Sequence, residues 1–241
     1  MPPARPTPVR RGLLVAVEGP SAVGKTTVVR RVASGGWAET LPEAYDRLRP
    51  ALSLDFRSPE ELRRLERRLF AEETRRSREA RRARARGARV LVDTGFAGPL
   101  TYTASLDERA DPGGAVLRDL LRSARTAARG GRWGLPDLVI VLTAPARLLD
   151  ARTQRDPVGH PRSLAGRHRR VGIREVAFWR AVARSLPAPR VLFVSATGDA
   201  RGVAARVRAA IDGVGDLRPS GPRAAARFLA VLRRWHRGSR R

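Results

Sequence analysis

The sequence predicts an α/β fold in which a parallel sheet carries helices on both faces. Short apolar segments of strand length alternate along the chain with longer segments that have helical periodicity. The strand segments are apolar throughout rather than at every second residue, which is typical of parallel strands covered on both faces. A chain of 241 residues, 42% of them hydrophobic, is long enough to form one domain of this kind around a full core.

The elements expected from these patterns cover most of the chain. Strands are expected at residues 13–17, 89–93, 136–144 and 190–198, with one more just before Glu43. Helices are expected at residues 26–34, 59–87, 111–131, 145–156, 172–186 and 199–212, and a loop is expected at 157–170. The helix at 59–87 has the clearest start, because Ser58 and Glu61 form a candidate capping box in front of an apolar stripe.

The two ends of the chain differ in composition from this domain. Residues 1–11 are expected to be a flexible N-terminal lead-in, residues 12–214 the domain, and residues 215–241 a linker and basic C-terminal tail. The tail has the pattern of an amphipathic helix, and it could dock on the domain, remain disordered, or contact a membrane or nucleic acid. In the first two cases, deleting residues 219–241 is expected to leave activity within a few-fold of that of the full chain.

The net charge of +26 raises the question of a nucleic-acid partner. The basic residues are spread along the chain rather than grouped around aromatic residues, so a nucleic-acid partner is not expected. The absence of cysteine excludes disulfides, thiolate metal sites and a cysteine nucleophile. No apolar run reaches about 18 residues, so we expect no transmembrane segment, and the cytoplasm is the expected location.

Lys25 is the only lysine in the sequence, although lysine and arginine together number 49. The composition is rich in Ala, Arg and Gly and contains no Asn, which suggests a GC-rich genome in which arginine fills generic basic positions. A lysine that persists in such a sequence marks a position where arginine is unsuitable. A compact ammonium on a flexible chain fits beside phosphates where a planar guanidinium is too wide.

Lys25 lies in the segment GPSAVGKTT, residues 19–27, which matches the P-loop (Walker A) pattern G-x-x-x-x-G-K-[ST]. The segment follows an expected strand and precedes an expected helix, so its backbone N–H groups and the helix N-terminus would surround an anion. The Thr26 hydroxyl is expected to bind Mg²⁺. The nucleotide-binding residues expected from this loop are Gly19, Pro20, Ser21, Ala22, Val23, Gly24, Lys25, Thr26 and Thr27.

Composition excludes two classes of nucleotide-binding protein. Regulatory GTPases recognise guanine with an Asn/Thr-Lys-x-Asp element, and this chain has no Asn and no lysine besides Lys25. Protein kinases need a catalytic Asn for their second metal ion. Small kinases remain as the class to consider.

Three segments resemble the thymidylate kinases and deoxynucleoside kinases. VAVEGPSAVGKTT is similar to the start of these enzymes, and RRLFAEETRRSREARRARARGARVLVDTGFAGPLTYTAS is similar to a helix that leads into a strand and a D-R motif. PDLVIVLTAPARLLDARTQRD resembles their fourth strand and arginine-bearing lid. The resemblance covers roughly residues 12–200. It implies a three-layer P-loop kinase fold, with about five parallel strands, helices on both faces and a lid at about residues 145–170.

The resemblance also implies an activity and a set of catalytic residues. The chain would be an ATP- and Mg²⁺-dependent kinase that moves the γ-phosphate to a nucleoside, a nucleoside monophosphate or a nucleoside-like small molecule. Lys25 would hold the phosphates, Asp93 would bind Mg²⁺ or accept a proton, and Glu43 would act as the base. Arg152 and Arg155 in the lid would stabilise charge on the transferred group.

The sequence departs from the family pattern where the acceptor would bind. The D-R motif reads Asp93-Thr94, and the pattern F-A-A-D-R reads FAEET, with Thr74 in place of the arginine. Arg75 or Arg76 could restore a charge. Because arginine is the residue that usually holds a phosphate at such positions, the departures favour an acceptor that has no phosphate.

Two alternatives stay open. One is a small-molecule or antibiotic O-phosphotransferase of the same fold, and the other is a nucleic-acid-binding P-loop ATPase. The two classes differ in what stimulates ATP turnover, which is a small acceptor in the first case and a polynucleotide in the second. The sequence also leaves the oligomeric state open, including a homodimer.

Overall fold

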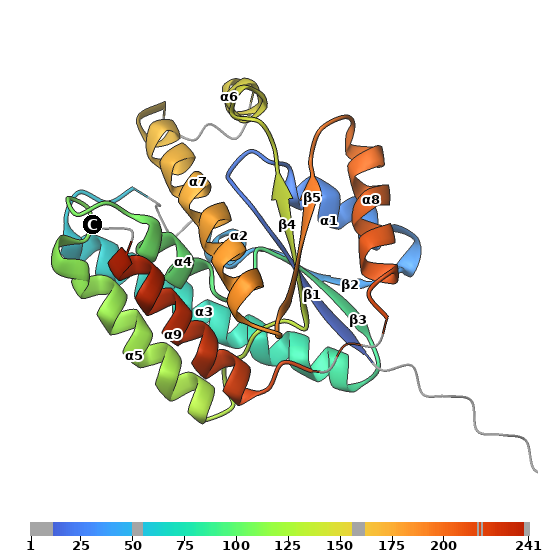
Figure 1. Cartoon of the computed structure of the whole chain (residues 1–241), viewed down its shortest axis with the longest axis horizontal. Helices are drawn as coiled ribbons and strands as arrows, with labels where there is room; N and C mark the ends of the chain where they lie inside the picture. Colours follow the sequence, from blue (N-terminus) through green and yellow to red (C-terminus); the bar gives the residue numbers. More distant parts are fainter. Residues whose placement is uncertain (1–11, 50–54, 156–161, 216, 218, 239–241) are drawn as a thin grey trace, which may run out of the picture.

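The sheet at the centre of the protein has five parallel strands in the order β2-β3-β1-β4-β5 (Figure 1). The structure is a computed structural model that describes residues 12–49, 55–155, 162–215, 217 and 219–238. The strands are β1 (Leu13–Glu18), β2 (Glu39–Leu41), β3 (Arg89–Asp93), β4 (Leu138–Thr143) and β5 (Arg190–Ser195). The predicted parallel sheet is confirmed, as is the number of strands that the resemblance implied.

Alternate residues of the central strands belong to two hydrophobic cores on opposite faces of the sheet. In β1, Leu14 lies in the larger core, whereas Val15 and Val17 lie in the smaller one. The smaller core is covered by α1 (Lys25–Ala33) and α8 (Ala200–Asp212), and the larger core by α3 (Pro59–Ala85), α4 (Gly98–Ser105), α5 (Ala115–Arg129), α7 (Arg162–Ser185) and α9 (Pro222–Gly238). The sheet lies between these two helix layers in Figure 1, which confirms the predicted three-layer fold.

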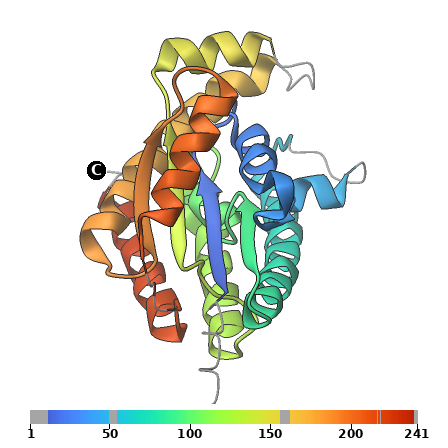
Figure 2. The same ribbon diagram turned by 90° about the vertical axis from the view of Figure 1, so that its right-hand side faces the viewer.

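Two further helices follow the carboxyl ends of strands. The helix α6 (Ala146–Gln154) follows β4 and lies beyond the ends of the strands (Figure 2), and α2 (Ala44–Leu48) follows β2. The short 3₁₀ helices η1 (Ser34–Gly36) and η2 (Pro112–Gly114) precede β2 and α5. Ligands of parallel α/β sheets bind outside the carboxyl ends of the strands, so this edge is where a site is expected.

The prediction of a loop at residues 157–170 is wrong for residues 162–170, which are helical. The helix α7 begins at Arg162 and continues for 24 residues. Glycine and proline indicated a loop, but residues 162–170 contain no proline and only one glycine, Gly166, and one glycine in a helix costs only about 1 kcal/mol. Burial of Phe178 and Trp179 farther along the same helix outweighs that cost. Residues 156–161 lie outside the described part of the chain.

The C-terminal helix α9 is part of the larger core. It packs against α5 and α7, and Phe228 is fully buried against Phe178 and Trp179, with ring centroids 5.5 and 5.8 Å from its own. This packing agrees with docking on the domain, one of the three expectations for the tail. None of the helices in the described part of the chain combines the length and the apolar character needed to cross a membrane.

Candidate active site

The loop at residues 19–27 connects β1 to α1 at the carboxyl edge of the sheet. The backbone is left-handed at Ala22 (φ 61°) and Gly24 (φ 97°). Gly19 has a φ of 138°, and a Cβ there would lie 2.5 Å from the backbone oxygen of Leu142. No side chain caps the start of α1, so the first N–H groups of this helix can bind an anion.

Lys25 is the first residue of α1, and its ammonium group lies against the loop. Nζ donates hydrogen bonds to the backbone oxygens of Gly19 at 3.0 Å and Pro20 at 3.2 Å. An ammonium has three donors, so one remains for a ligand even in this arrangement. A planar guanidinium could not occupy the same space without displacing the carbonyl groups.

Asp93 ends β3 next to the loop. It pairs in register with Val17 of β1 and is 2% exposed, and its Oδ1 atom has no hydrogen-bond partner among the described residues. A buried carboxylate oxygen of this kind costs free energy unless a ligand binds it. Together with the Thr26 hydroxyl, it supplies the oxygen ligands that Mg²⁺ prefers.

A Mg²⁺ ion at this site would need phosphate oxygens of the nucleotide as ligands in addition to protein side chains. The described residues contain no cluster of three acidic or histidine side chains that could hold a metal by itself. Mg²⁺ in kinases is bound through one or two carboxylates and the substrate phosphates, so such a cluster is not required. The residues therefore fit Mg²⁺, and Thr26 and Asp93 as its ligands stay a prediction.

A cavity of about 720 Å³, called the P-loop cavity below, opens beside the loop. Its wall consists of the loop, the region of α2, and parts of α3, α4, α6 and α7. The structure brings four of the predicted catalytic residues to this wall, namely Lys25, Glu43, Arg152 and Arg155. Asp93 is buried beside the cavity, close enough to Glu43 for its charge to act on that carboxyl.

Glu43 lies at the N-terminal end of α2, just after β2. It is half-buried, and burial raises its pKa, while Lys25 lowers this pKa and Asp93 raises it. A carboxylate whose pKa is raised above its ordinary value is a stronger base and therefore a better proton acceptor. The position agrees with a role as the base, which stays a prediction.

Glu18 joins the end of β1 to the turn that follows β3. Its Oε1 atom accepts a hydrogen bond from the N–H of Gly95 at 3.0 Å, and a Cβ at Gly95 would lie 2.6 Å from that atom. Burial raises the pKa of Glu18 to about 8, with a further increase from Glu175 and a decrease from Lys25. Glycine at position 95 thus leaves room for a buried carboxyl between the two strand ends.

The arginine that the D-R motif lacks is not replaced by a neighbour on α3. Arg76 is fully buried, and its Nη2 atom donates to the backbone oxygens of Asp93 at 2.8 Å and Thr94 at 3.1 Å. Its Nη1 atom pairs with Glu73 at 2.5 Å. Arg75 points elsewhere, with 68% of its side chain exposed and an ion pair within its own helix. The guanidinium of Arg76 therefore supports the left-handed turn at Thr94 (φ 56°) rather than an acceptor phosphate.

Arg152 and Arg155 lie near the end of α6 in different surroundings. Arg152 donates from Nη1 to the backbone oxygen of Val23 at 2.8 Å and from Nη2 to that of Ala196 at 3.0 Å. These bonds connect the helix to the P-loop and to the segment after β5. Arg155 is exposed at the end of α6 and borders the cavity. Their role in stabilising transferred charge stays a prediction.

Three carboxylates of the cavity wall, Glu66, Glu73 and Glu175, were not predicted as site residues. A signal for two of them was present, because Glu66 and Glu73 fall at helical spacing with Leu62 on the apolar face of α3. Glu175 is on α7 and accepts a hydrogen bond from the Thr101 hydroxyl at 3.2 Å. Burial raises the pKa of Glu73, while its ion pair with Arg76 lowers it, and burial raises the pKa of Glu175 to about 7.

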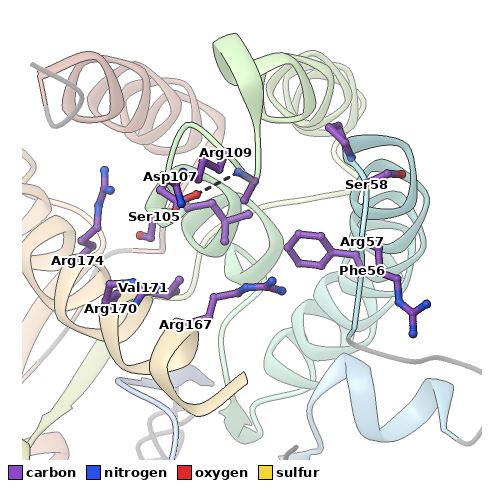
Figure 3. A pocket seen from close by; sticks show the side chains of 13 residues that line it. Phe56, Arg57, Ser58, Ser105, Asp107, Arg109, Arg167, Arg170, Val171 and Arg174 are labelled. Carbon is purple, nitrogen blue, oxygen red and sulfur yellow. Dashed lines mark hydrogen bonds between the residues drawn. The ribbon is translucent and has the colours of Figure 1, made fainter. Parts of the chain in front are cut away.

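A second cavity of about 400 Å³ lies between the start of α3, the end of α4 and α7 (Figure 3). Arginines dominate its wall: Arg57, Arg109, Arg167, Arg170 and Arg174. The guanidinium carbon of Arg167 lies 4.4 Å from the ring centroid of Phe56. Val171 borders both this cavity and the P-loop cavity. The second cavity is thus mainly basic, with Asp107 as its acidic residue, whereas the P-loop cavity is lined by both basic and acidic side chains.

Solved structures with a similar fold include a thymidylate kinase and a deoxyadenosine kinase. Thymidylate kinase from Candida albicans aligns with a TM-score of 0.61 and 16% identity, over 88% of this chain and 96% of its own. Deoxyadenosine kinase from M. mycoides, with dCMP and dCDP bound, aligns with a TM-score of 0.60 and 10% identity over 83% of this chain and 99% of its own. No family model and no curated protein matches the sequence. At these identities the likeness shows a shared P-loop kinase fold, as the resemblance implied.

Proposed function

We propose that this protein is an ATP- and Mg²⁺-dependent phosphotransferase that moves the γ-phosphate to a nucleoside, a nucleoside monophosphate or a nucleoside-like small molecule. The observation that carries the proposal is that one cavity contains both the phosphate loop with Lys25 and the half-buried carboxylate of Glu43. A γ-phosphate and an acceptor hydroxyl can meet in that space. The fold shared with thymidylate and deoxyadenosine kinases supports the same proposal.

The loop and Lys25 would bind the phosphate donor. The N–H groups at the start of α1 would bind phosphate oxygens, and the Lys25 ammonium would exchange its contacts with Gly19 and Pro20 for the β- and γ-phosphates. Mg²⁺, when bound, supplies charge neutralisation at the phosphates. Thr26 and Asp93 would hold it from the protein side.

Glu43 would accept the proton of the acceptor hydroxyl. The hydroxyl oxygen forms a bond to the γ-phosphorus, and the bond from that phosphorus to the bridging oxygen of ADP breaks. Negative charge on the moving group would develop beside the lid, where Arg152 and Arg155 border the cavity. The helix α6 would exclude water from the transfer.

Among the acceptors, we expect those without a phosphate to be preferred. Arg76 uses its guanidinium on the protein itself, and Arg75 points away from the cavity. Each charge-assisted hydrogen bond that a phosphate lacks is worth about 1.5–3 kcal/mol. The value of kcat/KM for dTMP should therefore be below that for thymidine under identical ATP and Mg²⁺. A value for dTMP about a hundredfold above that for thymidine would contradict this preference.

The proposal is tested by transfer of labelled γ-phosphate from ATP to thymidine, deoxyadenosine, dTMP and a set of aminoglycosides. A parallel reaction contains single-stranded DNA and no small acceptor. Transfer to at least one small molecule, lost in Lys25→Ala, supports a kinase. ATP hydrolysis that rises with DNA, without transfer to any small molecule, contradicts it.

A further inference from the structure

Glu66 is buried at the wall of the P-loop cavity with one carboxylate oxygen unpartnered. The residue is 1% exposed and borders the cavity, and its Oε2 atom has no hydrogen-bond partner among the described residues. Buried polar groups are otherwise satisfied by hydrogen bonds, cations or water. An unpartnered carboxylate oxygen at the wall of a cavity therefore indicates that a group of the ligand forms the missing hydrogen bond.

A second carboxylate, Glu175, borders the same cavity from α7. The hydroxyl of Thr101 donates to one of its oxygens at 3.2 Å. Burial raises the pKa of Glu66 well above its usual range, and the nearby charge of Glu175 raises it further. Burial and the charge of Glu175 thus disfavour the ionised form of Glu66, and a positive charge close to both carboxyl groups would stabilise their ionised forms.

Three arginines in or near the cavity wall have partners other than Glu66 and Glu175. Arg76 neutralises Glu73 and lies behind the wall. Arg152 binds backbone oxygens of the P-loop and of the segment after β5. The guanidinium of Arg49 lies over the ring of Tyr45, 4.5 Å from its centroid, with the residue exposed. Lys25, Arg30 and Arg155 also line the cavity, and Lys25 lowers the pKa of Glu175. Among the described residues, however, no ion pair joins Glu66 or Glu175 to a basic side chain, although the chain has a net charge of +26.

We propose that the phosphate acceptor is an alcohol that also carries a protonated amine, and that Glu66 and Glu175 bind the ammonium group. This inference rests on the proposed function and specifies its acceptor class. An ammonium donates up to three hydrogen bonds, and the unpartnered Oε2 atom of Glu66 can accept one of them. Leu65, Leu69 and Val171 of the wall would contact the carbon skeleton.

The chemistry of transfer is unchanged by the ammonium. The acceptor oxygen forms its bond to the γ-phosphorus, the bond to the ADP oxygen breaks, and the hydroxyl proton passes to Glu43. The amine keeps its proton throughout and does not react. Its carboxylate partners therefore act on acceptor binding and orientation, and their removal should raise KM more than it lowers kcat.

The test uses two pairs of probes that differ in whether they carry an amine. The pairs are 3′-amino-3′-deoxyadenosine with adenosine, and 2-deoxystreptamine with myo-inositol. Calorimetry on the full chain, with a non-hydrolysable ATP analogue and Mg²⁺ at neutral pH, gives the Kd of each probe without turnover. We expect at least one amine to bind about tenfold or more tightly than its neutral partner, and Glu66→Gln to remove this preference.

Two further variants make the result decisive. Glu79→Gln is the matched control, because Glu79 is on the same helix but half exposed and paired with Arg47, and it should leave every Kd unchanged. Glu175→Gln should weaken the preference for the amine and serves as the test variant if Glu66→Gln does not fold.

The outcomes separate this inference from the proposed function. Equal affinity for amine and neutral probes, an amine preference that survives in both glutamine variants, or no binding of any probe beside a bound ATP analogue would overturn the ammonium site. Failure of the ATP analogue to bind would contradict the proposed function instead.

Discussion

At the scale of single residues, Lys25 shows that the shape of a cation matters as well as its charge. Its Nζ atom lies 3.0 and 3.2 Å from two carbonyl oxygens of the loop, so the ammonium fits within the turn. A guanidinium carries its donors in a rigid planar fork. The only lysine of the chain is therefore located where a compact cation is needed.

Lys25→Arg is expected to fold normally and to lose more than about nine tenths of its phosphoryl transfer, which corresponds to about 1.4 kcal/mol or more of transition-state stabilisation. The measurements are kcat/KM with the best acceptor and the Tm. Arg31→Lys, the reverse change at an exposed position of the same helix, should alter neither. Turnover of the Lys25 variant above about a tenth of wild type would falsify the argument from cation shape.

At the scale of elements, the turn after β3 is supported by a neighbouring helix. Arg76 of α3 donates to the two backbone oxygens of this turn and pairs with Glu73 in a fully buried position. A buried ion pair adds little when it is intact, but losing one partner leaves a charge without compensation. The geometry around Asp93 therefore depends on a residue 17 positions earlier in the chain.

Arg76→Met is expected to lower the free energy of unfolding by about 3–5 kcal/mol, because it leaves Glu73 buried without its cation. Urea unfolding measures the change. The double variant Glu73→Gln with Arg76→Met should recover part of the loss, since it removes the uncompensated carboxylate. An unfolding midpoint equal to that of wild type in Arg76→Met would show that the pair does not support the fold.

Elements with a strong local signal could be predicted from the sequence, and elements formed by packing could not. The apolar strands and the long α3 were expected close to their observed positions. The eight-residue α4 was missed because its stability comes from contacts with α3, α5 and α7 rather than from its own pattern. The same distinction applies to the site. The P-loop and Glu43 could be predicted because they follow strands directly, whereas Glu66 and Glu175 are brought to one cavity only by the packing of separate helices.

At the scale of the whole molecule, buried carboxyl groups make stability depend on pH. Burial raises the pKa of Glu18 to about 8 and that of Glu175 to about 7, from an ordinary value of 4.5. Between these values the folded state keeps protons that the unfolded state has released. The free energy of unfolding must then fall as pH rises through this window.

The Tm of the protein without ligands is therefore expected to be higher near pH 5 than near pH 8. Scanning calorimetry across this range measures the slope. Glu175→Gln should flatten the slope, because the amide has no proton to release. A Tm that stays constant or increases toward pH 8 would mean that these carboxyl groups titrate normally in the folded state.

The position of α9 in the larger core changes the result that we expect when residues 219–241 are deleted. Deleting residues 219–241 was expected to leave activity nearly unchanged, but the helix buries Phe228 in the larger core. We now expect the truncated chain to lose cooperative unfolding, and Phe228→Ala to cost about 3–5 kcal/mol. Arg227→Ala, at an exposed position beside it, is the control. A truncated protein that still melts cooperatively with wild-type turnover would contradict this.

The aromatic packing around α9 also determines what the protein's own fluorescence can report. Trp133 lies 6.5 Å from Phe228 between ring centroids, and Trp179 and Trp235 belong to the same aromatic group. Trp37 packs against the smaller core on the other face of the sheet. The described wall of the P-loop cavity contains no tryptophan. Ultraviolet emission should therefore follow the assembly of the C-terminal helix onto the domain, while nucleotide binding would need an extrinsic dye or a labelled ligand to be seen.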